Sequence, residues 1–358
     1  MSFAGAIRID LHRCQAGPHD VLIHSNRPVH AARALRQRTP AQATQLVQQL
    51  FTLCGTAQGI ACRNALRQAG SAPRQPDDLP DRRALLLETV REHLWRILVD
   101  WAEHTDSVVD ADSLRRCRTL AEDARPDDLA RQLRSSVFGV PLQQWLDIEH
   151  SDDLLDWART TDTVAAKMIH SLHRRGWCRD GQSKQPFLPD TPSDALHETL
   201  ASPDADRFIE QPVWTDQPHE TSPLARTQHA LLVRSVQSRF GRGLLARHVA
   251  LLVELAESPS RLNQPAPLRS DSVELPPSIG VAQVDAARGR LVHRVVVDDG
   301  RIDTYQIVAP TEWNFHPKGT LAEALSALGD GNRSELTEKA SLLVKAVDPC
   351  VGFELEVH

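Results

Sequence analysis

The chain has 358 residues, of which 41% are hydrophobic and 4% aromatic, and its formal net charge is −6. This length and composition indicate a globular protein with one large domain or two ordinary ones. The negative charge argues against a nucleic-acid partner, because phosphate binding usually requires a concentrated basic surface.

The start of the chain, Met1-Ser2-Phe3-Ala4-Gly5, has no basic region followed by an apolar stretch, so we expect no export signal. No run approaches the ~20 apolar residues of a membrane helix, and we expect a cytoplasmic protein with no membrane partner. The thiols should therefore be reduced. None of the cysteines forms a C-x-x-C pair, so any metal site must be assembled from residues distant in sequence. The six are Cys14, Cys54, Cys62, Cys117, Cys178 and Cys350.

The first half of the chain predicts one strand followed by helices. Residues 3–12 alternate apolar and polar side chains, which is typical of a strand. The period then becomes helical, and the last helix of this half should stop at Gly176. These helices are expected over residues 40–70, 82–104 and 151–175. Residues 176–222 are rich in Pro, Asp, Ser and Thr, and we expect a long irregular surface excursion there.

The second half begins with a strong helical pattern over 224–257, interrupted at Gly241-Arg242-Gly243. A second Pro-rich excursion is expected at 259–279. Beta-prone runs over 281–309 are joined by Asp298-Asp299-Gly300, a hairpin turn in which glycine supplies the positive φ. Two short helices should follow, near 320–328 and 333–347. We therefore predict a single domain over 1–358, mainly α, with a small antiparallel β-sheet made from the N-terminal strand and the 281–309 hairpin.

An ordered set of motifs fills the block 280–328: G-V-A-Q-V-D-A-A-R-G-R-L-V-H, then D-D-G-R-I-D-T-Y-Q-I-V, then A-P-T-E-W-N. This block closely resembles the C-terminal part of nickel–iron hydrogenase large subunits. Shorter matches at Gly5–Asp10, Leu53–Ala57 and Asp348–Cys350 follow in the order of that family. The resemblance implies a shortened large-subunit-like fold.

Several positions depart from the family's pattern. In the family, four cysteines from two motifs hold nickel, and two of them also bridge to iron. Here the first cysteine of each motif remains, as Cys54 and Cys350, whereas the second positions are Ala57 and Phe353. Neither of these side chains offers a lone pair, so the resemblance implies that no stable nickel–iron centre of the usual kind forms. Three further positions differ from the family: Ala4 stands where the family has a glutamate, and Ala61 and Glu356 stand where it has histidines.

Other positions of the family's metal pocket are retained. Two groups that donate hydrogen bonds to the iron's cyanide ligands in the family match Arg288 and Thr311 by position. A guanidinium and a hydroxyl can satisfy an anionic cyanide nitrogen in a dry pocket, and thiolates suit low-valent iron. The resemblance therefore implies that Cys54 and Cys350 anchor a transient Fe(CN)2(CO) unit, with Arg288 and Thr311 holding its cyanides.

This combination is similar to one branch of the family, the HupK/HoxV-type hydrogenase maturation proteins. These are regarded as scaffolds that hold the iron unit before its delivery. The resemblance implies a protein that is not an enzyme, with hydrogenase maturation proteins and the apo large subunit of a nickel–iron hydrogenase as partners. Two alternatives stay open: a metal-free interaction protein that kept the fold, and a divergent metalloenzyme that uses Cys54, Cys62 and Cys350.

Each candidate also has an ordinary structural interpretation. A lone cysteine on an apolar helix face, such as Cys54, is more often core filler than ligand. Cys62 lies two helical turns further along and could be a substitute ligand, although we favour core packing. His293 matches a family histidine near the metal pocket and is equally well explained as a buried structural residue. Arg288 could instead pair with Asp285 or Asp10. Cys14, Cys117 and Cys178 match nothing in the family and are interpreted as structural.

Overall fold

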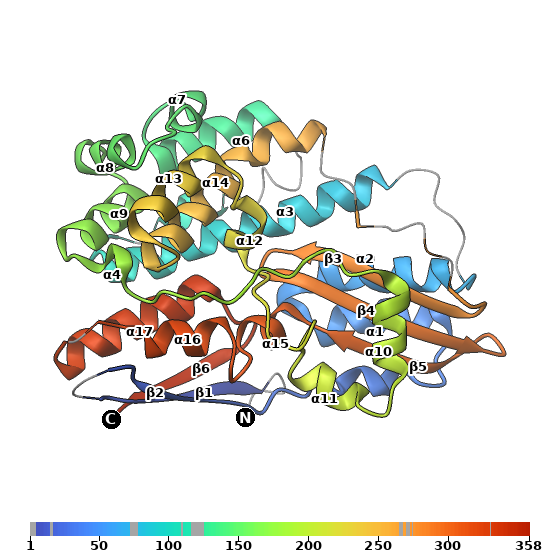
Figure 1. Cartoon of the computed structure of the whole chain (residues 1–358). Helices are drawn as coiled ribbons and strands as arrows, with labels where there is room; N and C mark the ends of the chain where they lie inside the picture. Colours follow the sequence, from blue (N-terminus) through green and yellow to red (C-terminus); the bar gives the residue numbers. More distant parts are fainter. Residues whose placement is uncertain are drawn as a thin grey trace.

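The computed structural model describes residues 5–14, 17–71, 78–108, 110–115, 125–264, 268–269, 273, 275–329 and 331–358. Ala4 and Cys117 lie outside these ranges. Helices form an upper layer, and two three-stranded sheets with their own helices lie below it (Figure 1). None of the helices in the described part of the chain is long and apolar enough to span a membrane.

The first sheet has the order β2-β1-β6 and carries the N and C marks of Figure 1 along it. Strand β1 (Ala6–His12) pairs antiparallel with β2 (Asp20–Ser25) and parallel with β6 (Gly352–Val357). Its alternate residues Ile7, Ile9 and Leu11 are fully buried, which confirms the predicted strand. The predicted sheet was wrong, because this strand does not join the 281–309 hairpin. Its partners are two strands that the sequence analysis missed.

The second sheet is an antiparallel meander, β3-β4-β5. It consists of β3 (Ile279–Ala286), β4 (Gly289–Asp298) and β5 (Arg301–Val308). The predicted hairpin turn is confirmed: Asp299 and Gly300 have φ values of 45° and 68°, the left-handed pair that a two-residue turn requires. One face packs on α1 and α2, and the other on α10 and α11.

The predicted helix over 40–70 is two helices. Helix α1 (Pro40–Leu50) ends at Phe51, and a 3-10 turn (Thr52–Cys54) leads into α2 (Gly55–Gln68). Close packing of α2 on the sheet depends on Gly280, where an added Cβ would lie 1.8 Å from the carbonyl oxygen of Ala65. The break at Phe51 places Cys54 at the start of α2 and not in the middle of a helix.

Most other helices match the expected ranges. The helix near 82–104 is confirmed as α3 (Leu79–Trp95), a π-helical segment (Arg96–Trp101) and α4 (Ala102–His104). The 151–175 pattern divides into α8 (Ser151–Thr160) and α9 (Val164–Arg174), and Gly176 follows with a φ of 75°.

The helices of the second half show the predicted break at Gly241-Arg242-Gly243. The pattern over 224–257 forms α12 (Pro223–Thr227), α13 (Leu231–Phe240) and α14 (Leu244–Asn263). The upper layer also contains α6 (Pro126–Leu133), a π-helical segment (Arg134–Phe138) and α7 (Leu142–Leu146).

The expectation of an irregular excursion over 176–222 is wrong. The segment contains a 3-10 turn (Trp177–Arg179), α10 (Ser193–Ala201) and α11 (Ala205–Glu210). Their buried side chains, including Leu196 and Phe208, pack with Trp313 on the second sheet. Proline and aspartate here precede helix starts, where both are favoured. The second irregular stretch, predicted from residue 259, starts later than expected, because α14 continues through Pro259 to Asn263. Parts of 259–279 lie outside the described residues.

The last helices connect the two sheets; Thr311 of the predicted site lies on the first of them, and Cys350 follows the last. They are α15 (Pro310–Asn314), α16 (Thr320–Ser326) and α17 (Arg333–Val347). The last two confirm the predicted short helices. Helix α17 ends at Asp348, which has a left-handed φ of 60°, and the chain then turns through Cys350 into β6.

Candidate metal site

Four residues from distant segments line one small inner pocket of about 10 Å³, the space of about one water molecule. Cys54 reaches it from the start of α2, and Arg288 from the turn between β3 and β4. Thr311 reaches it from the first turn of α15, and Cys350 from the link into β6. The structure thus brings together all four residues proposed from sequence.

A larger cleft of about 610 Å³ adjoins this pocket. Cys54, Ala309 and Cys350 line both spaces, so the two cysteines stand between them. Most residues that line the cleft are apolar, and two leucines form an exposed apolar rim: Leu50 is 45% exposed and Leu53 is 51% exposed.

Thr311 makes two hydrogen bonds with Cys350. Its hydroxyl donates to the Cys350 sulfur at 3.1 Å, and its oxygen accepts from the Cys350 backbone N–H at 3.3 Å. Thr311 is buried, and Pro310 before it begins α15 with a fixed φ that suits a helix start. This pair joins the P-T-E-W-N and D-P-C motifs in space.

Arg288 is buried with its side chain held between two carboxylates. Its Nη2 donates to Glu92 at 2.7 Å, and its Nε lies 3.2 Å from an oxygen of Asp348. Nη1 is buried and has no hydrogen-bond partner among the described residues. Burial lowers the pKa of Arg288, but Asp348 and Glu92, followed by the nearby cysteines, raise it overall, so the guanidinium is charged.

The alternative partners considered for Arg288 were wrong. Asp285 pairs with Arg269 and Arg290. Asp10 lies on β1 and pairs with Arg8.

Cys54 is a neutral thiol at ordinary pH. Burial raises its pKa to about 12, and the neighbouring acidic groups Cys350 and Glu88 add to this shift against the opposing effect of Arg288. The Glu88 carboxylate accepts hydrogen bonds from the backbone N–H groups of Thr56 at 2.8 Å and Ala57 at 3.1 Å. These two donors of the first turn of α2 would otherwise have no partner within the helix. A metal ion that binds the Cys54 sulfur must therefore displace a proton.

A buried chain of hydrogen bonds runs from the second sheet to Cys54. Tyr305 donates to His293 Nδ1 at 2.7 Å, and His293 Nε2 donates to the Gln58 side-chain oxygen at 2.8 Å. The Gln58 amide nitrogen lies 3.7 Å from the Cys54 sulfur, to which it donates. Burial lowers the pKa of His293 to about 3, so the ring is neutral, and a neutral ring can accept from Tyr305 and donate to Gln58 as this series of hydrogen bonds requires. His293 thus acts on Cys54 through Gln58 and lines neither cavity.

The remaining candidates lie outside the pocket. Cys62 is fully buried between α2 and the second sheet and lines neither cavity. Ala57 and Ala61 are buried in α2, while Phe353 and Glu356 lie on β6. Cys14 and Cys178 are likewise absent from both linings.

Several residues of the site were missed from sequence. Glu92 and Asp348 hold Arg288, and Gln58 contacts Cys54. Asp348 was visible in the D-P-C motif, whereas Glu92 and Gln58 looked like ordinary helical positions. Arg27, which lines the large cleft, follows β2 in a segment with no recognisable pattern.

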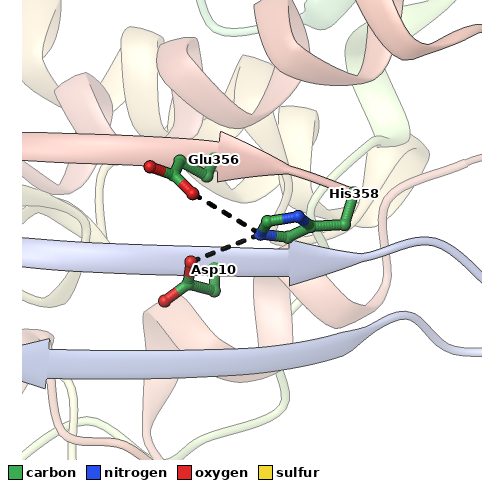
Figure 2. Close-up of side chains that lie close together, drawn as sticks. All are labelled: Asp10, Glu356 and His358. Carbon is green, nitrogen blue, oxygen red and sulfur yellow. Dashed lines mark hydrogen bonds and ion pairs between the residues drawn. The ribbon is translucent and has the colours of Figure 1, made fainter.

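One other cluster gathers possible metal ligands. Figure 2 shows His358 pointing at Asp10 on β1 and Glu356 on β6, with its Nε2 3.3 Å and 3.8 Å from their carboxylate oxygens. Among the described residues it is the only such group of three or more. Arg8 already pairs with both carboxylates, so an ion-pair network accounts for the cluster. It lies at the opposite end of β6 from Cys350.

Comparison with known proteins gives the context of this site. Residues 232–351 match the family described as nickel-dependent hydrogenase; this span includes Arg288, Thr311 and Cys350 but not Cys54. The chain is 31% identical to the hydrogenase expression/formation protein HoxV of Cupriavidus necator, over 93% of this chain and 92% of HoxV. It is 28% identical to the hydrogenase expression/formation protein HupK of Rhizobium leguminosarum bv. viciae, over 99% and 97% of the two chains.

The fold is shared with solved hydrogenase structures. The Ni-Fe-Se hydrogenase from Desulfomicrobium baculatum superposes with a TM-score of 0.63 at 15% identity, over 94% of this chain and 95% of that one. The predicted fold class, mainly helical and like a hydrogenase large subunit, is therefore confirmed.

Proposed function

This chain belongs to the family of hydrogenase expression/formation proteins that includes HoxV and HupK, and from that premise we propose that it is a non-catalytic scaffold in nickel–iron hydrogenase maturation. In this role it transiently holds an Fe(CN)2(CO) unit and passes it to the apo large subunit. Its partners are that subunit and the maturation proteins that supply the unit.

The observation that carries the proposal is the convergence of Cys54, Cys350, Arg288 and Thr311 on one pocket. Two thiols can bind a low-valent iron atom, and a charged guanidinium with a buried, unpartnered Nη1 can donate to an anionic cyanide. The residues present thus fit the cargo. Because the inner pocket has room for about one water molecule, Cys54 and Cys350 would hold the unit mainly from the side of the larger cleft.

The same site argues against hydrogen turnover. Ala57 and Phe353 bring no donor atom to the pocket, so the two thiols are left without the second pair that a nickel–iron centre uses. Among the described residues, no third carboxylate, imidazole or thiol converges with Cys54 and Cys350. A site with two protein ligands suits a cargo that must leave again.

A second candidate is a metal-free interaction protein for hydrogenase assembly. Exposed Leu50 and Leu53 on the apolar rim favour it, since apolar surface of this kind is often used for protein contacts. This role requires the rim but not the thiols.

A maturation assay separates the two. Hydrogenase activity is measured in cells that lack the gene and carry it back as wild type, Cys54→Ala, Cys350→Ala or the control Cys14→Ala. The scaffold role predicts that only the wild type and Cys14→Ala restore activity. Full activity with Cys54→Ala and Cys350→Ala would leave the metal-free role.

A further inference from the structure

Arg27 is a buried arginine with unused hydrogen-bond donors in the wall of the 610 Å³ cleft. It follows β2, and only 8% of its side chain is exposed. A guanidinium has five N–H donors. Among the described residues, its one hydrogen-bond partner is Glu312, which Nη1 contacts, and its buried Nε has none.

Arg27 stands between two cavities. It lines the 610 Å³ cleft beside Cys54 and Cys350, and also a neighbouring cavity of about 280 Å³ that reaches Thr311. Glu312 lines both spaces too, and its side chain is 6% exposed. The Arg27–Glu312 pair therefore forms part of the wall that the thiols face.

The charges near the thiols favour an anion on this side. Burial lowers the pKa of Arg27, but the carboxylate of Glu312 raises it overall, so the guanidinium stays charged. Arg288 on the inner side is shared by two carboxylates, Glu92 and Asp348. Arg27 has only one, which leaves it the less compensated of the two guanidinium groups.

We propose that Arg27 is a second anion-binding residue of the candidate metal site, which donates to a cyanide of the bound Fe(CN)2(CO) unit from the cleft side while Arg288 acts from the inner pocket. Glu312 is its positioning residue, because it fixes the guanidinium against the wall. This inference rests on the proposed scaffold function. It explains why a charged side chain is buried beside two thiols with donors unused.

The test is the infrared spectrum of protein purified anaerobically from cells that express the maturation genes. Arg27→Lys keeps the charge but loses the planar set of donors. The double variant Arg27→Met/Glu312→Gln removes both charges together, so no uncompensated charge stays buried. Arg33→Lys is the matched control, since Arg33 lies on the same segment in an exposed pair with Asp206 and does not line the cleft.

We expect Arg27→Lys to shift a cyanide band and the double variant to lower the amount of bound unit about tenfold, the loss of one charge-assisted hydrogen bond. Arg33→Lys should match the wild type. Unchanged bands and unchanged loading in both Arg27 variants would overturn the role of Arg27 and leave the scaffold function standing. A wild-type protein without any cyanide or carbon monoxide bands would overturn both.

Discussion

The hydroxyl of Thr311 donates to the sulfur of Cys350 across 3.1 Å, and its oxygen accepts from the backbone N–H of the same residue. The contact joins the first turn of α15 to the link between α17 and β6. It also means that the hydroxyl has a partner in the pocket when no cargo is present. In the proposed scaffold function, this hydroxyl would turn from the thiol to a cyanide when the iron unit binds.

Replacement of Thr311 by valine tests this contact. The backbone N–H of Cys350 would lose its acceptor, so we expect the free energy of unfolding to fall by about 1 kcal/mol. Chemical denaturation measures the change. The exposed Thr160, whose hydroxyl bonds only to its own helix, gives the control Thr160→Val, which should change stability much less. Equal losses in the two variants would contradict a special role for the Thr311 hydroxyl.

Arg288 is expected to be structural as well as functional. Arg288→Met would leave Glu92 and Asp348 without this buried partner, and a broken buried pair costs about 3 kcal/mol or more. Arg288→Lys keeps the charge and should be clearly more stable in thermal unfolding than Arg288→Met. If the two variants melted together, the ion pairs would not be the reason for the burial of Arg288.

His293 should make the protein sensitive to acid. Burial lowers its pKa from 6.5 to about 3 in the folded protein, so its contribution to stability is present above pH 6.5 and is lost as the pH falls toward 3. In this window the unfolded chain binds one more proton there, which corresponds to about 1.4 kcal/mol per pH unit.

His293→Gln should remove that part of the slope when the free energy of unfolding is measured from pH 6.5 down to pH 4. His248, which is also buried and has its pKa lowered to about 4, contributes to the slope in both proteins. The exposed His150→Gln serves as the control for the loss of a histidine. A slope unchanged by His293→Gln would show that the buried ring is not what resists protonation.

The two thiols can be tested without any maturation system. Cadmium ions bind thiolates and give an ultraviolet charge-transfer band, and binding must displace the Cys54 proton, whose pKa is raised to about 12. The affinity should therefore increase with pH, by about tenfold per unit for each proton released. Cys54→Ala and Cys350→Ala should each weaken the band strongly, and Cys14→Ala should leave it intact. A pH-independent affinity would contradict a neutral Cys54 thiol.

Local patterns were enough to predict much of the fold. The Asp298-Asp299-Gly300 turn and the break at Gly241-Arg242-Gly243 were read correctly because glycine and turn residues act through local backbone geometry. The break between α1 and α2 was missed, since Phe51 carries no such signal. The parallel pairing of β6 with β1 joins the two ends of the sequence, and no local pattern specifies so distant a partner.

The residues of the candidate site likewise fall into those that a local motif reveals and those that only tertiary contacts reveal. Arg288, Thr311 and Cys350 could be proposed because each lies within a recognisable motif, and the fold places them with Cys54 in one pocket. Arg27 and Glu92 could not be proposed, since their importance arises only from tertiary contacts with Glu312 and Arg288. The metal-binding role of the pocket stays a prediction.

The most direct test of the scaffold function is the infrared spectrum of the wild type beside Cys54→Ala and Cys350→Ala, each purified anaerobically from cells with the maturation genes. We predict bands of metal-bound cyanide and carbon monoxide in the wild type that are absent from both variants, while circular dichroism shows all three folded. A folded wild type that is active in maturation and carries no such bands would contradict the scaffold function.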